Sequence, residues 1–267
     1  MPDFIRLNSP NFNDRAPSVA LCYVVLHYTG MKTGAEARER LCNQAAKVSA
    51  HYLIEEDGSI YQLVDEDKRA WHAGESFWRG VTDMNSASIG IELVNPGHEF
   101  GYVPFPEVQI EALIELSRGI LTRHLIPPQR VVGHSDVAPA RKVDPGELFP
   151  WEQLAANGIG MVPPPLAGEV PSNAKRREAE GGSLTCTLPS AALSRATFPA
   201  SGGGSDFAQM LARFGYGVPP EVDIPLATVV TAFQRHFRPE IIDGVVDAET
   251  ESRLAALLEM LNEEQSP

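Results

Sequence analysis

The stretch VVGHSDVAPARKVDPGELFPW, residues 131–151, decides how the rest of the chain is interpreted. Two β-branched valines suit the end of a buried strand, and Gly133 then lets the chain turn sharply. His134 would stand at the edge of that strand, where an imidazole can face a cleft. Three prolines stiffen the following residues into a loop with a fixed course.

The same loop supplies a carboxylate and an ammonium group. Asp144 precedes a proline, which favours extended backbone, and residues two apart on an extended segment share a side. Lys142 and Asp144 should therefore point the same way as each other. An isolated His and Asp more often cap a strand and form a turn. A catalytic zinc site usually has three protein ligands, so a third is needed to support one here.

Two earlier strands provide further polar side chains. Residues 22–27, CYVVLH, form a β-prone run that ends on His27, and residues 85–94, NSASIGIELV, form a second. Three strand ends then present His27, Glu92 and His134. We expect them to meet at one edge of the sheet, where sites in α/β folds usually lie.

Glu92 stands in the middle of an apolar strand, where a carboxylate is costly to bury unless it is paired or reaches a polar cleft. Gly90, two residues earlier on the same face, is expected to leave room for a ligand. The alternative is a structural ion pair with an arginine.

The other patterns of residues 1–160 alternate strands with helices. Thr33 and Glu36 fit a capping box that opens a helix to about Ala46, and the Asp-Gly pair at 57–58 signals a hairpin. Pro106 suits the first turn of another helix. We therefore predict an α/β fold with a mixed β-sheet flanked by helices.

Composition changes after residue 160. Residues 161–204 are rich in Pro, Gly and Ser and indicate a linker. Residues 205–267 carry helical patterns over 206–214, 225–237 and 249–261, which predict a small three-helix domain. We expect this domain to be semi-independent of the catalytic domain, residues 1–160; the alternative is that its helices pack on that domain.

The net charge of −13 argues against a nucleic-acid partner, which requires a basic face. The first residues, MPDFIRLNSPNFNDRAP, contain no apolar h-region, so neither a signal peptide nor a membrane anchor is visible. The expected protein is cytoplasmic and has no transmembrane segment.

Five motifs occur in an order that matches a known family: YVVLHY at 23–28, SAHYLI at 49–54, WHAG at 71–74, SIGIEL at 88–93 and GHSDVAPARKVDPG at 133–146. Over about residues 5–160 the chain resembles the zinc N-acetylmuramoyl-L-alanine amidases of the AmpD/AmiD type, which are relatives of the peptidoglycan recognition proteins. FGYGV at 214–218 and AFQRHFRPE at 232–240 resemble the helical peptidoglycan-binding-type domain of longer members.

The resemblance implies that His27, His134 and Asp144 are Zn²⁺ ligands, with Glu92 as the catalytic acid and Lys142 as the catalytic lysine. It implies cleavage of the amide bond between N-acetylmuramic acid and L-alanine in peptidoglycan or muropeptides, a step of cell-wall turnover. The wall-binding-like tail makes the periplasm or cell envelope the alternative compartment.

Trp71, His72 and Asn85 are candidate substrate contacts, although a structural, hydrogen-bonded role for His72 is equally compatible with the sequence. Asp136 could compete with Asp144 as a ligand, but its position favours an Asx-turn. The remaining histidines outside the sheet are interpreted as surface residues: His98, His124 and His236.

Two other functions remain open. One is a peptidoglycan-binding protein without catalysis, and the other is a zinc hydrolase of another bond in the stem peptide. Non-catalytic relatives lose a ligand or the acid, whereas all five positions are filled here.

Overall fold

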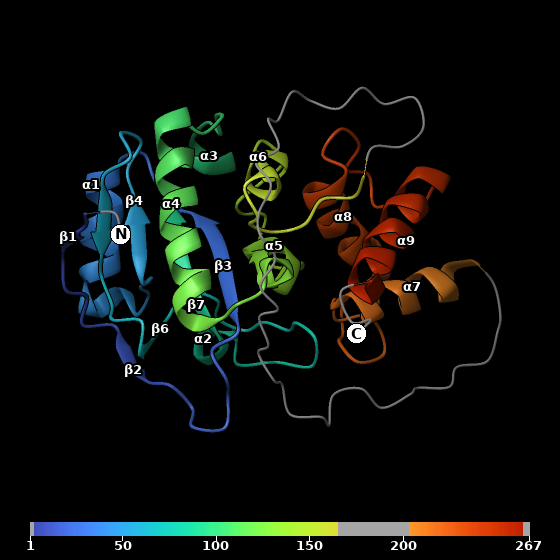
Figure 1. The fold of residues 1–267 in the computed structure, drawn as a ribbon, viewed down its shortest axis with the longest axis horizontal. Helices are drawn as coiled ribbons and strands as arrows, with labels where there is room; N and C mark the ends of the chain where they lie inside the picture. The colour runs from blue at the N-terminus through green and yellow to red at the C-terminus, as the bar shows by residue number, and fades with distance from the viewer. Residues whose placement is uncertain (1–2, 165–202, 264–267) are drawn as a thin grey trace.

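The computed structural model describes residues 3–164 and 203–263, and a six-stranded sheet lies at the centre of its first part (Figure 1). The strands, in their spatial order, are β1 (Ile5–Arg6), β5 (Ile60–Gln62), β4 (Tyr52–Ile54), β7 (Ser88–Leu93), β3 (Tyr23–Tyr28) and β8 (Val131–Gly133). The β4–β5 hairpin is antiparallel and the other neighbouring pairs are parallel. The predicted mixed sheet with flanking helices is therefore confirmed.

Local signals start and stop several of these elements. The Thr33 side chain accepts a hydrogen bond from the Glu36 backbone and starts α1 (Gly34–Cys42). This helix ends before the predicted Ala46, because the Asn43 side chain accepts from the Ala45 backbone and opens a separate 3-10 turn, η1 (Gln44–Ala46). A second small sheet pairs β2 (Phe12–Asp14) with β6 (Lys68–Ala70).

The long helix α4 (Glu107–His124) covers one face of the sheet (Figure 1). Ile110 and Leu113 of this helix share a buried cluster with Val24, Leu26 and other strand residues that point to that side. Burying such apolar surface is the main stabilising term of the fold. The shorter elements around the sheet are α2 (Met84–Ala87), α3 (Gly97–Phe100), η2 (Pro128–Arg130), α5 (His134–Val137) and α6 (Trp151–Ala156).

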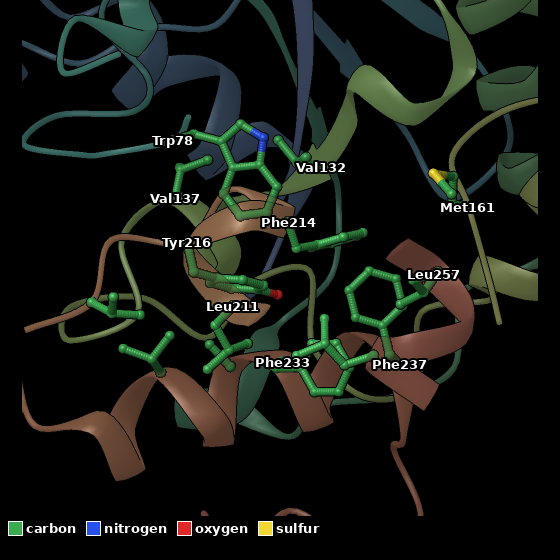
Figure 2. Close-up of a cluster of buried hydrophobic side chains, with 14 of the residues drawn as sticks. Trp78, Val132, Val137, Met161, Leu211, Phe214, Tyr216, Phe233, Phe237 and Leu257 are labelled. Atoms are coloured by element: carbon green, nitrogen blue, oxygen red, sulfur yellow. The ribbon is translucent and has the colours of Figure 1, made fainter. Parts of the chain in front are cut away.

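Three C-terminal helices follow the patterns predicted for them: α7 (Gly203–Phe214), α8 (Leu226–Phe237) and α9 (Ala248–Glu263). Figure 1 shows α5 between β3 and α8. Side chains of the helical part, among them Phe214 and Phe233, share one buried cluster with Tyr23 and Val25 of the sheet. Figure 2 shows Val132 of the sheet in the same cluster. The described residues thus show the packed alternative, not a semi-independent unit.

The linker predicted over 161–204 falls mainly on residues outside those the structure describes, and the domain boundaries stay a prediction. His236 was predicted to lie on the surface, and this is wrong: it is 6% exposed, because α8 packs against α5 and α6. His98 is exposed as predicted, whereas His124 is half-buried beside Glu66. In the described part of the chain, no helix combines the length and apolar character that a membrane span requires.

Candidate active site

Strand register brings the predicted site residues to one level of the sheet. In the β3–β7 pair His27 lies opposite Glu92, and in the β3–β8 pair Leu26 lies opposite Gly133. His134 follows Gly133 directly and so reaches the level of His27. Three strand ends therefore meet at one edge of the sheet, as predicted.

Two imidazoles and a carboxylate converge at this edge. The Nδ1 atoms of His27 and His134 are 2.8 Å apart, and the Asp144 Oδ2 atom lies 3.1 Å from the first and 3.0 Å from the second. All three residues are buried. An ion at about 2.0–2.2 Å from tetrahedral N and O ligands holds them roughly 3.3 Å apart, so one metal ion fits this donor set.

The far ring nitrogens fix which tautomer each histidine adopts. His134 Nε2 lies 3.1 Å from the Ala73 carbonyl oxygen, so this nitrogen carries the proton and donates it. His27 Nε2 lies 3.1 Å from His72 Nδ1, and His72 Nε2 lies 3.3 Å from Ser88 Oγ. With each Nε2–H donating outward, the lone pairs of both Nδ1 atoms face the common point, as metal binding requires.

This chain of hydrogen bonds places His72 behind the site. Its ring is 8% exposed and points at His27 and Ser88, which favours the structural role for it over a substrate contact. The space expected beside Gly90 is likewise filled, which corrects the prediction that a ligand occupies it. A Cβ atom at Gly90 would lie 2.4 Å from the His72 ring, so the glycine admits an imidazole.

Burial and neighbouring charges set the protonation of the group. Burial, together with the neighbouring His134, lowers the pKa of His27 to about 4, which leaves it neutral and able to bind a metal. Burial alone would raise the pKa of Asp144, but the two imidazoles outweigh it and lower that pKa well below its usual range. Asp144 is therefore ionised.

Glu92 shows the opposite behaviour. Burial, followed by the charge of Asp144, raises the pKa of Glu92 well above its usual range, while Lys142 opposes the rise. The Oε2 atom of Glu92 is buried and has no hydrogen-bond partner among the described residues, which speaks against the alternative of a structural arginine pair. A carboxyl group with a raised pKa beside a metal-binding group is typical of a general acid or base.

The other candidates hold the surrounding loops. Asn85 is buried, and its Oδ1 atom accepts from the backbone of His72 and Ala73, which positions the carbonyl that receives His134 Nε2–H. Trp71 Nε1 donates to Asn13 Oδ1 at 2.6 Å. Asp136 is not part of the metal-binding group, and its carboxylate accepts from the Gly133 backbone, Tyr216 and His236 instead.

Sequence reasoning missed the second layer of the site. The Ala73 carbonyl carries no sequence signal. Ser88 did carry one, because it shares the face of Gly90 and Glu92 in the strand SIGIEL and is a polar residue in an apolar run.

A cavity of about 720 Å³ lies elsewhere, between α6 and the helices α8 and α9. Trp151, Glu152, His236 and Arg253 are among its lining residues, and the metal-binding group is not. The candidate chemistry and this cavity are therefore separate features of the molecule.

His51, which lies behind His72, predicts a pH-dependent stability. It is buried and accepts from the Gly90 backbone at 2.9 Å. Burial, followed by the charge of Arg15, lowers the pKa of His51 from 6.5 to about 3. Because the unfolded chain takes up the proton first, this stabilisation is complete above pH 6.5 and is lost as the pH falls toward 3.

We expect His51→Gln to make the metal-free protein lose unfolding free energy less steeply between about pH 6.5 and pH 5, by up to about 1.4 kcal/mol per pH unit. Urea denaturation at a series of pH values measures the slope. His98→Gln, at an exposed histidine, serves as the control for the loss of an imidazole. A wild-type slope in His51→Gln would contradict the prediction.

Comparison with known proteins agrees with this geometry. The N-acetylmuramoyl-L-alanine amidase family model matches residues 18–147. AmiD of Escherichia coli K12 is 39% identical over 255 residues, which cover 88% of this chain and 82% of AmiD.

Two solved structures cover 94% of the chain. One is E. coli AmiD in complex with anhydro-N-acetylmuramic acid-L-Ala-D-gamma-Glu-L-Lys, with a TM-score of 0.71, 35% identity and 98% of its chain covered. The other is AmpDh3 from Pseudomonas aeruginosa in complex with anhydromuramic pentapeptide, with a TM-score of 0.70, 32% identity and 97% covered. The chain belongs to the N-acetylmuramoyl-L-alanine amidase family.

Proposed function

We propose that the protein is a zinc-dependent amidase that hydrolyses the amide bond between N-acetylmuramic acid and L-alanine in muropeptides. The observation that carries the proposal is the convergence of His27, His134 and Asp144 beside a carboxyl group with a raised pKa. The likeness to two amidases solved with anhydromuramyl peptides supports the substrate class.

The donor set fits zinc, since imidazole nitrogens and a carboxylate oxygen are the ligands that catalytic zinc sites use. His27, His134 and Asp144 would hold the ion. The chemistry that such an ion would supply is a water whose pKa is lowered to about 7 and a polarised substrate carbonyl.

Glu92 moves the proton in this proposal. Its carboxylate takes a proton from the attacking water and returns it to the nitrogen of L-alanine as the amide C–N bond breaks. The products are the muramyl lactyl carboxylate and a free peptide amine. The raised pKa of Glu92 suits both proton transfers, because the carboxyl group can hold the proton between its uptake from water and its return to the nitrogen.

Lys142 supplies a positive charge to the same space. The charge of Lys142 lowers the pKa of both His27 and Glu92, which supports a position close to the reacting groups. An ammonium there stabilises the negative charge that develops on the carbonyl oxygen during attack.

We also propose the domain division 1–160, 161–204 and 205–267, with Trp71 as a substrate contact. The wall polymer as a partner of the last segment, and the compartment, stay predictions from sequence.

Mass spectrometry of purified muropeptides tests the activity. We expect the wild-type protein to release an intact stem peptide with a free L-alanine amine from anhydromuramyl peptide, at a rate that a zinc chelator abolishes and added zinc restores. A cut inside the stem would favour the rival hydrolase, and binding without any product would favour the non-catalytic protein.

A further inference from the structure

Asp136 joins the candidate active site to the C-terminal helices. One carboxylate oxygen, Oδ1, accepts from the Tyr216 hydroxyl at 2.6 Å, and the other, Oδ2, accepts from His236 Nδ1 at 2.7 Å. Oδ2 also accepts from the Gly133 backbone at 2.7 Å. All three side chains are buried: Asp136 is 1% exposed, Tyr216 0% and His236 6%.

The position of Asp136 gives this contact its significance. It lies on α5, the four-residue helix that begins with His134. The backbone N–H of Ser135, also on α5, donates to the Asp144 carbonyl oxygen at 2.8 Å. This helix therefore supports two of the three converging groups, the His134 side chain directly and Asp144 through its backbone.

A helix of four residues has too few internal hydrogen bonds to hold its own position. The C-terminal part surrounds it with packed rings instead. The His236 ring stacks on the Trp151 and Phe237 rings, with ring centroids 3.7 Å and 3.8 Å apart. The Tyr216 ring packs edge-on against Trp78 at 4.8 Å, beside Val137 of α5 in the same buried cluster (Figure 2).

We propose that Tyr216 and His236 are positioning residues of the active site, because they fix Asp136 and thereby hold α5 where His134 and Asp144 meet His27. The inference rests on the proposed role of these three residues as the zinc ligands. It assigns the C-terminal helices a part in building the metal site, which is separate from any binding of wall polymer.

Full-length variants that remove one hydrogen bond each provide the test. Tyr216→Phe deletes a single oxygen atom, and His236→Phe keeps a ring for stacking but loses the donor. Hydrogen bonds to a buried carboxylate are strong, and groups that orient metal ligands typically change metal affinity or activity 10- to 100-fold. We expect each variant to bind zinc about 10- to 100-fold more weakly in chelator competition and to lose kcat on a soluble anhydromuropeptide.

The expected losses fall on zinc affinity and kcat, with KM close to the wild-type value, since neither side chain contacts the substrate in this proposal. The visible spectrum of the Co²⁺-substituted protein should also change, because it reports the ligand geometry. His236→Asn retains a donor near the Nδ1 position and should recover part of the zinc affinity that His236→Phe loses.

Gln234→Met is the matched control. Gln234 is as buried as His236 and lies on the same helix, but its hydrogen bonds go to Asp243, Gly244, Val245 and Thr250 within the C-terminal part. This variant should lower the unfolding temperature without changing zinc affinity or the cobalt spectrum.

Wild-type zinc affinity, kcat and cobalt spectrum in Tyr216→Phe would overturn the inference, even if its unfolding temperature fell. That result leaves the proposed function intact, whereas a wild-type protein that binds no zinc or cleaves no muropeptide would defeat the proposed function itself. Equal losses in Gln234→Met would also overturn the inference, because they would trace to general destabilisation.

Discussion

We expect His134→Ala to abolish zinc binding and amidase turnover together. The substitution removes one of three donor atoms that lie within 3.1 Å of one another in a buried group. The two that remain, His27 and Asp144, cannot complete a tetrahedral site that has three protein ligands. We expect zinc content to fall from about one ion per chain to near zero, and turnover to fall to the level of the metal-free protein.

Elemental analysis after dialysis, together with the muropeptide assay, measures both quantities on one sample. His124→Ala is the control, because this histidine is the last residue of α4, pairs with Glu66 and is not part of the metal-binding group; the variant should keep zinc and rate. Full zinc occupancy in His134→Ala would show that the ion binds elsewhere.

The second large effect is expected for Glu92→Gln, which should slow catalysis without removing the metal. Glu92→Gln keeps the size of the side chain but cannot accept a proton, so zinc should remain while kcat falls by roughly 10²–10⁴. The raised pKa of Glu92 and its unpartnered Oε2 atom motivate the choice. Lys142→Ala should likewise keep zinc and lose rate, because its proposed action is on the transition state.

Glu99→Gln, at an exposed carboxylate on α3, is the matched control and should leave the rate unchanged. If Glu92→Gln retained near-normal activity, the general base would have to be another group. Measuring zinc content in the same preparations excludes loss of metal as the cause of a slower rate.

Short-range sequence patterns predict much of the secondary structure. Period-two alternation predicts the strands that carry His27 and Glu92, and the Thr33 cap and the Asp-Gly turn at 57–58 mark their neighbouring elements correctly. The three C-terminal helices follow from apolar spacing. These features succeed because backbone conformation and the direction of each side chain depend mainly on residues within a few positions.

The candidate site is partly determined in the same way. A histidine at the end of a β-prone run and a stiff loop after another strand predict converging side chains, because parallel strands end at a common edge. The register then brings His27, Glu92 and His134 to one level. The groups that hydrogen-bond the candidate ligands were not predicted. The His72 ring beside Gly90 and the carbonyl of Ala73 depend on loop positions that no local pattern encodes.

By itself, then, the sequence predicted the strands that carry His27 and Glu92, the hairpin at 57–58 and the three C-terminal helices, and it identified five residues expected to carry the chemistry. The tertiary structure alone decided where the C-terminal helices lie and that His236 is buried against Asp136, a residue 100 positions earlier. The physical reason is that an apolar helix stripe specifies that it must be covered but not by which surface. The partner is selected when the whole chain packs, through shape and through hydrogen bonds that satisfy each buried polar group.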